Sequence, residues 1–196
     1  MNRKTFDQFA SVIGLIIAVV LIVAGFLLQW GGNFAKGQVK DQLVAQKITF
    51  PKAGSDSLKA LPATDRAAME KYADQDMTTG DQAYTWANHY IKVHMGYIAD
   101  GKTYDEVSGE FMAKNAALQA DPNNKTLAAT VAALGQQRQS LFMGSTLMGL
   151  LGFTYAFATI GKIALIASYA AFIAGLLLFI LAIAGFAQVR KAETES

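Results

Sequence analysis

Two histidines are the strongest candidates for chemistry in this chain. His89 and His94 are the only histidines. Five residues apart on a helix, they point about 140° away from each other, because each residue turns the helix by about 100°. A helical zinc motif has its histidines four apart with a glutamate between them, and no glutamate separates these two. We therefore expect no metal and no other cofactor.

Other catalytic patterns are missing from the sequence. Cysteine is absent, which excludes disulfides, thiolate zinc sites and a cysteine nucleophile. The motifs G-x-S-x-G and G-x-G-x-x-G and the phosphate-binding P-loop are absent too, so hydrolase and nucleotide chemistry have no support. Residues 31–138 carry equal numbers of acidic and basic side chains, without the basic patch that binds nucleic acid. The sequence predicts a protein that is not an enzyme and does not bind nucleic acid.

A group of aromatic side chains offers a second kind of site, for an apolar ligand. If the segment that carries them and the neighbouring helices enclose a pocket, its lining would come from Tyr84, Trp86, Tyr90, Tyr97 and Phe111. Pockets for small molecules are mostly apolar, with a few polar groups that fix orientation. Simple packing of these rings against one another is the other explanation.

Three long stretches without charged residues are expected to anchor the rest of the chain, including the candidate residues above. No formally charged side chain occurs in residues 8–34, 139–161 or 163–189. A bilayer core of roughly 30 Å takes about 20 helical residues, so each stretch is long enough to cross it. We predict an all-α membrane protein with an N-terminal signal-anchor helix, a helical extramembrane cap and a C-terminal transmembrane hairpin that turns at Gly161-Lys162.

The charge pattern suggests boundaries and an orientation. The predicted segments are a short N-terminal tail (1–8), a transmembrane helix (9–30), a helical extramembrane domain (31–139), a transmembrane or re-entrant helix (140–161), a transmembrane helix (163–187) and a polar tail (188–196). Arg3 and Lys4 favour a cytoplasmic start and hence an extracytoplasmic 31–139, in a multi-pass protein of the plasma membrane. Three crossings would leave Arg190 and Lys191 outside, against the rule that favours cytoplasmic cations. A re-entrant 140–161 would instead put both termini in the cytoplasm.

Helix signals dominate residues 31–139. Thr64 is expected to cap a short helix, and Thr79 to open one that runs to about residue 99. Gly101 ends that helix, and Thr103 with Glu106 forms a capping box that starts the next one. Gly101, Thr103 and Glu106 therefore make a tight helix corner.

Small residues recur at helical spacing in the two C-terminal stretches. They form the rows Ala167-x3-Ala171-x3-Gly175, Ala170-x3-Ala174 and Ser145-x3-Gly149. Such rows let helices approach closely in a membrane. Packing within the predicted hairpin is the favoured explanation, and the helix of a partner subunit or a second copy is the other. The stretches contain no ionisable residue, the usual mark of a transport pathway.

One part of the chain resembles a known family. The run Gly101-Lys102-Thr103-Tyr104 and the later run 137–144 (QRQSLFMG) resemble a family of small actinobacterial membrane proteins of unassigned function. The resemblance covers most of the chain and implies a bacterial plasma membrane. Some members carry the label aromatic ring-opening dioxygenase. That chemistry needs a non-haem iron held by two histidines and a carboxylate, which two divergent histidines do not supply.

The sequence favours one function over two others. We expect a non-enzymatic accessory or scaffold subunit of a membrane complex, in contact with the lipid bilayer and with a partner subunit or a second copy. The alternative is a membrane protein that binds a lipid or small ligand between its cap and its helices. A metal-dependent membrane enzyme centred on His89 and His94 is third.

Overall fold

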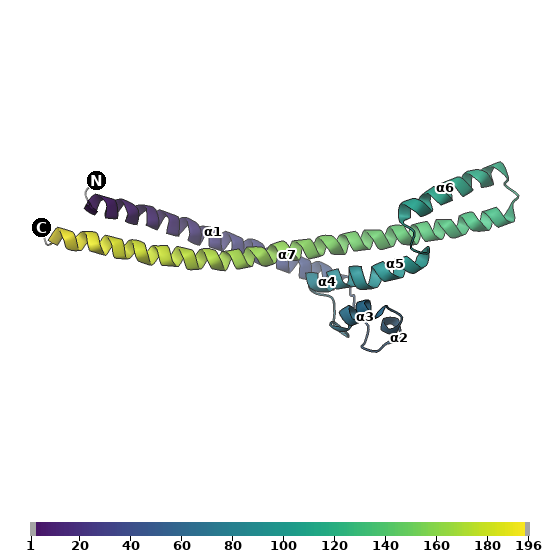
Figure 1. Ribbon diagram of the computed structural model, residues 1–196, viewed down its shortest axis with the longest axis horizontal. Coiled ribbons are helices and arrows are strands. Elements are labelled where there is room, and N and C mark those ends of the chain that lie inside the picture. Colours follow the sequence, from purple (N-terminus) through teal and green to yellow (C-terminus); the bar gives the residue numbers. More distant parts are fainter. Residues whose placement is uncertain (1–2, 195–196) are drawn as a thin grey trace. The chain divides into compact units, whose positions relative to one another are not determined.

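Every regular element of this chain is a helix within the residues that the structure describes. The computed structural model describes residues 3–194 (Figure 1). In chain order the helices are α1 (Arg3–Ala45), α2 (Asp56–Lys59), α3 (Ala63–Glu70), α4 (Gly80–Trp86), the π-helix η1 (Ala87–Ile91), α5 (Lys92–Ile98), α6 (Tyr104–Ala120) and α7 (Lys125–Thr194). The predicted all-α class is confirmed.

Two of these helices, α1 and α7, are long and apolar enough to cross a membrane. Their candidate spans are Thr5–Ala45 and Lys125–Lys191. Much of their apolar surface faces outward, since Phe9 is 62% exposed and Leu181 is 66% exposed. A core helix of a soluble protein buries such side chains, whereas a membrane helix presents them to lipid. Length, composition and exposure all agree with two membrane helices.

The chain forms two compact units. The helix-pair unit takes the described residues up to Gln38 and from Ala158 onward, and the cap unit is Val39–Phe157. Both boundaries fall inside a long helix, so α1 and α7 each contribute to both units. The cap unit therefore differs from the predicted domain 31–139: it begins later and includes residues 140–157, which were predicted to lie in the membrane.

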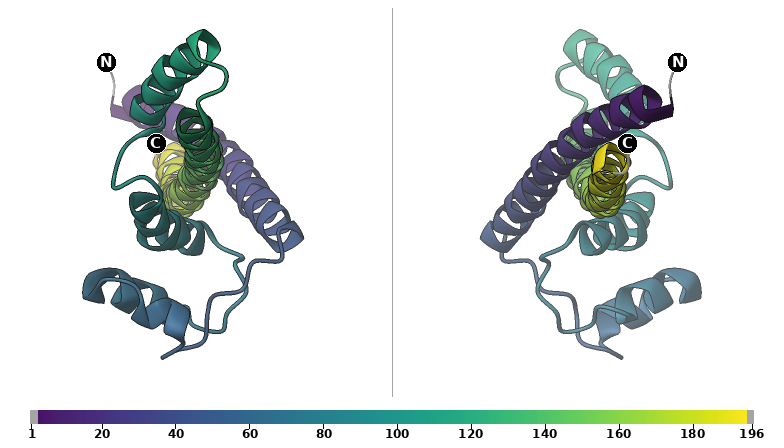
Figure 2. Two further views of the ribbon diagram at one scale, coloured as in Figure 1. Left: turned by 90° about the vertical axis from the view of Figure 1, so that its right-hand side faces the viewer. Right: turned by 90° about the vertical axis from the view of Figure 1, so that its left-hand side faces the viewer.

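In the helix-pair unit, α1 and α7 run antiparallel along a seam of small residues (Figures 1 and 2). The seam residues are buried and lie seven apart on each helix: Ser11, Ala18, Gly25 and Gly32 on α1, and Gly161, Ser168, Gly175 and Ala182 on α7. A seven-residue repeat keeps one face of a helix turned toward its partner when the two coil around each other. Ser11 meets Gly185 near one end, so the start of α1 lies beside the end of α7.

The glycines of the seam stand where a side chain would meet the other helix. A Cβ atom at Gly32 would lie 2.6 Å from Cγ of Leu165 and 2.8 Å from the carbonyl oxygen of Gly161. A Cβ atom at Gly175 would lie 3.2 Å from the carbonyl oxygen of Ala18. Small residues at such positions bring two backbones together, and the resulting van der Waals contact is a main source of helix association in membranes.

The structure corrects the predicted C-terminal hairpin. α7 continues without interruption through Gly161 and Lys162, where the turn was expected. Gly161 serves close packing instead, because a Cβ atom there would lie 2.9 Å from Cβ of Ala35 on α1. An isolated glycine inside a helical pattern often has such a packing role, and no proline follows this one to stop the helix. The predicted helices 140–161 and 163–187 are one helix.

Most of the predicted packing residues lie outside the seam. Gly175 is buried in it and faces α1 rather than a second C-terminal helix. The others are half-buried (Ala167, Ala171 and Ala174) or exposed (Ala170, Ser145 and Gly149). The predicted rows join small residues four positions apart, whereas the residues of α7 that contact α1 lie seven positions apart.

Both long helices extend beyond their predicted limits. α1 begins at Arg3, inside the predicted tail 1–8, and continues past residue 30 to Ala45. Val39 and Leu43 are buried at 5% and 2% exposure, and this helical spacing keeps one face of α1 packed. α7 continues through the predicted polar tail 188–196 as far as Thr194.

In the cap unit, the short helices pack around Phe50. The Phe50 side chain is 1% exposed, and its ring lies 5.4 Å from the ring of Tyr72 and 5.1 Å from that of Trp86. The predicted cap at Thr64 is wrong: α3 begins at Ala63 and Pro62 precedes it, with no side-chain cap. Proline suits a helix start because its fixed φ fits the first turn.

Candidate functional site

The two histidines make separate contacts. Nδ1 of His89 lies 2.7 Å from Oδ1 of Asp65, which links η1 to α3. Nδ1 of His94 lies 2.7 Å from the carbonyl oxygen of Tyr90, one turn earlier in its own helix. Within residues 3–194 no group of three His, Asp or Glu side chains comes close enough to hold a metal ion. The absence of a metal and of enzyme activity stays a prediction.

The predicted ligand-facing aromatics lie in separate places. Trp86 and Tyr90 pack with tilted rings 4.6 Å apart between centroids, and Tyr84 meets Tyr155 of α7 at 4.7 Å. Tyr97 is 65% exposed. Phe111, on α6, packs against the buried side chains of Val107, Leu134 and Leu141. The structure thus brings Trp86 and Tyr90 together, where they extend the packing around Phe50. A pocket between cap and helices stays a prediction.

The predicted helix corner is formed. Gly101 has a φ of +81°, a left-handed conformation that glycine adopts without strain. The hydroxyl of Thr103 accepts a hydrogen bond from the backbone N–H of Glu106 at 3.3 Å. The Glu106 carboxylate accepts in return from the backbone N–H of Thr103 at 2.7 Å and from its hydroxyl at 2.9 Å. These two bonds, the backbone one first, hold the pKa of Glu106 below its usual value.

Acid is expected to weaken this corner. Because the folded-state pKa of Glu106 is lowered, its contribution to stability is present above the unfolded-state pKa and is lost as the pH falls through the folded one. Thr103→Ala removes the hydroxyl donor and leaves the backbone donor, so the pKa of Glu106 should rise part of the way toward its usual value. An NMR titration of the Glu106 carboxyl carbon in detergent measures this change.

A second capping box provides the control. Thr79 and Gln82 start α4 with the same pair of hydrogen bonds, and the amide of Gln82 does not titrate. Thr79→Ala should leave the pKa of Glu106 unchanged. An equal shift in both variants would contradict the local origin of the effect.

The inner face of the N-terminal part of α7 is covered by α5 and α6. Leu134 and Leu141 of α7 form a buried cluster with Ala99 and Val107. The guanidinium carbon of Arg138 lies 5.1 Å from the ring centroid of Phe111, on α6. These contacts fix which side of α7 faces the cap and which side faces away from it.

The opposite side of this segment, here called the outer face, is apolar and exposed. Its large side chains are Phe142, Met143, Leu147, Leu150, Phe153 and Phe157. Phe153 is 76% exposed, and the others are between 50% and 58% exposed. A Cβ atom at Gly149, at the edge of this face, would have nothing within 4 Å, so the backbone there is open to approach. No charged residue interrupts α7 between Gln139 and Phe157.

The sequence indicated this segment but not its role. The charge-free stretch 139–161 was interpreted as a membrane crossing, while the structure places residues up to Phe157 in the cap unit with one side packed. Local spacing could not predict that Asp65 would pair with His89, since the two residues are 24 positions apart.

No protein-family model, no curated protein and no solved structure matches this chain.

Proposed function

We propose that this protein is a non-enzymatic accessory or scaffold subunit of a plasma-membrane complex, and that the outer face of α7 binds an apolar helix of another membrane subunit. The observation that carries the proposal is the exposure of this face, above all of Phe153 at 76%. Monomeric soluble proteins rarely leave a contiguous apolar patch of this kind uncovered, and large patches mark contacts with another protein or with a membrane.

The composition of the outer face suits a helix as the partner. Gly149, one turn before Phe153, leaves open backbone beside this aromatic side chain. Small residues let a second helix approach closely in an apolar medium, and an aromatic side chain gives the contact an anchor. The lack of charge from Gln139 to Phe157 removes the desolvation penalty that would oppose the contact.

The helix pair supports a cytoplasmic location for both termini. Two crossings bring Arg190 and Lys191 to the same end as Arg3 and Lys4, which removes the conflict that three crossings create. The opposite end carries three basic residues near the seam, Lys36, Lys40 and Lys162. Four basic residues against three favour the first end as the cytoplasmic one, so the cap would be extracytoplasmic. The family resemblance, still a prediction, agrees with a plasma membrane.

The proposed contact can be tested by photo-crosslinking in native membranes. A benzoylphenylalanine in place of Phe153 should give a discrete protein adduct. Leu150→Ala with Phe157→Ala should lower its yield about tenfold, which corresponds to a loss of about 1.4 kcal/mol from the two truncated contacts together. The mass of the adduct distinguishes another subunit from a second copy.

Phe9 of α1 provides the matched control, because it is also an exposed phenylalanine on a long apolar helix, at 62% exposure. The same photoreactive residue at position 9 should give lipid adducts alone. The proposal is wrong if position 153 also gives lipid adducts alone, or if the purified chain is a monomer that gives no protein adduct in its own membrane.

A further inference from the structure

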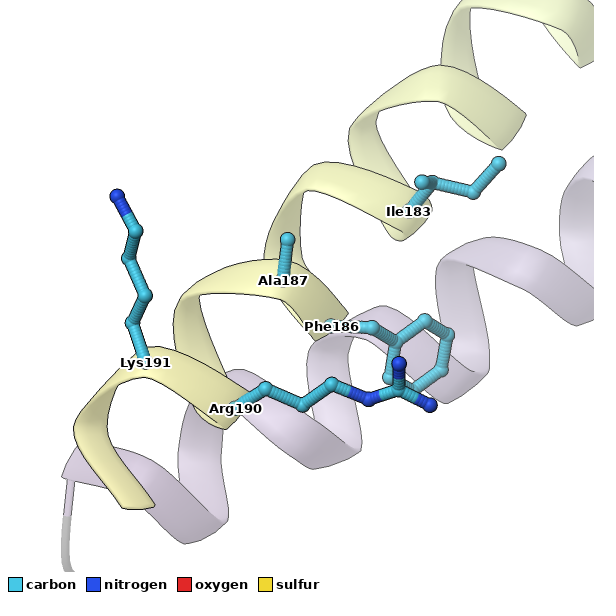
Figure 3. Close-up of a pocket in the computed structure, with 5 residues that line it drawn as sticks. All are labelled: Ile183, Phe186, Ala187, Arg190 and Lys191. Atoms are coloured by element: carbon cyan, nitrogen blue, oxygen red, sulfur yellow. The ribbon is translucent and has the colours of Figure 1, made fainter. Parts of the chain in front are cut away.

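A shallow recess lies near the C-terminal end of α7, away from the outer face. It is lined by Ile183, Phe186, Ala187, Arg190 and Lys191 (Figure 3). These positions follow the spacing i, i+3, i+4, i+7 and i+8, so they share one face of the helix. Along that face, apolar side chains come first and two cationic side chains follow one to two turns later.

Around the helix axis, Arg190 lies between Phe186 and Ile183, and Lys191 lies beyond Ala187. At about 100° of rotation per residue, Ala187 falls between Arg190 and Lys191 around the helix axis. Figure 3 shows the two basic side chains leaving the helix in different directions. The guanidinium of Arg190, which lies beside Phe186 in this view, can donate two parallel hydrogen bonds to a phosphate, and the ammonium group of Lys191 adds a second positive charge nearby.

We propose that this recess binds an anionic phospholipid, with the headgroup phosphate at Arg190, within the field of the Lys191 charge, and an acyl chain along Phe186 and Ile183. Along α7 the apolar side chains come before the cationic ones, and along a phospholipid the acyl chain comes before the phosphate in the same way. Free phosphate would match the cationic end alone and would leave the apolar side chains without a partner. Basic residues at the end of a membrane helix attract anionic lipids, each contributing to affinity near the membrane surface.

The inference goes beyond the proposed function and does not depend on it. It needs α7 to lie in a bilayer, and it uses no residue of the outer face. If the recess binds no lipid, the proposed partner contact is unaffected. If the outer face binds no partner, the proposed lipid site is unaffected.

Native mass spectrometry of the full chain, released from nanodiscs, tests the proposal. With equal amounts of phosphatidylglycerol and phosphatidylcholine, the wild-type chain should retain phosphatidylglycerol. Arg190→Gln with Lys191→Gln should lower the retained phosphatidylglycerol about tenfold, from the loss of two cations at the surface. Phe186→Ala should lower it less.

The control variant removes two cations from the other end of the helix pair. Lys36→Gln with Lys162→Gln should retain phosphatidylglycerol as the wild type does, and all variants should keep the wild-type thermal midpoint in lipid-free detergent. Equal retention by the wild type and the Arg190/Lys191 variant would overturn the proposal. So would equal loss in the control variant, or thermal stabilisation by inorganic phosphate as large as that by phosphatidylglycerol.

Discussion

Leucine in place of Gly32 is expected to force α1 away from α7 and to lower the thermal midpoint of the purified protein by on the order of 5 °C. The new Cβ would lie 2.8 Å from the carbonyl oxygen of Gly161, a backbone atom that cannot rotate away. Overpacking of this kind costs about 1–3 kcal/mol, and a chain of this size loses roughly 2–4 °C for each kcal/mol. Thermal unfolding in mild detergent measures the change.

The neighbouring glycine gives a matched control. Gly31 lies on the same helix at nearly the same depth, yet a Cβ atom there would have nothing within 4 Å. Gly31→Leu should therefore keep the wild-type midpoint. If the two variants unfold at the same temperature, the seam is not packed as described.

A crosslink provides a second measurement of the same seam. A Cβ atom at Gly14 would lie 3.8 Å from Cβ of Ala182, a separation that a disulfide accommodates. Since the chain has no native cysteine, Gly14→Cys with Ala182→Cys should form an intramolecular disulfide on oxidation. Adding Gly32→Leu should suppress that bond, and adding Gly31→Leu should not.

Much of the fold could be predicted because its signals are local. The absence of charge identified the apolar parts of α1 and α7, and the Thr103–Glu106 capping box located the start of α6. The all-α class follows from such signals, each of which depends on residues within one or two turns of each other.

The helix pairing could not be predicted in the same way, because it depends on contacts between distant residues. Gly161-Lys162 has the composition of a turn, and the contact of Gly161 with Ala35 is what makes it a packing position. The seven-residue repeat of Ser11, Ala18, Gly25 and Gly32 is visible in the sequence once two antiparallel helices are assumed. The recess at Arg190 likewise required knowing that α7 stays helical through residues predicted to be a tail.

The largest single loss of stability is expected in the cap unit, from Phe50→Ala. The Phe50 ring is 1% exposed and contacts Trp86 of α4 and Tyr72 of the turn after α3, so its removal leaves a cavity between separate segments of the cap unit. Truncating a buried phenylalanine costs about 3–5 kcal/mol, which corresponds to a drop in midpoint on the order of 10 °C. Limited proteolysis should report the same change as faster cleavage within Val39–Phe157.

The division into two units determines which measurements this substitution should leave unchanged. Because Phe50 lies in the cap unit, the disulfide between Gly14→Cys and Ala182→Cys should still form in the Phe50→Ala variant. Tyr97→Ala is the control, since Tyr97 is 65% exposed in the same unit and its truncation opens no cavity. Equal cleavage rates in the two variants would contradict the role of Phe50 in the core. Loss of the disulfide together with the cap would mean that the helix pair depends on the cap for its folding.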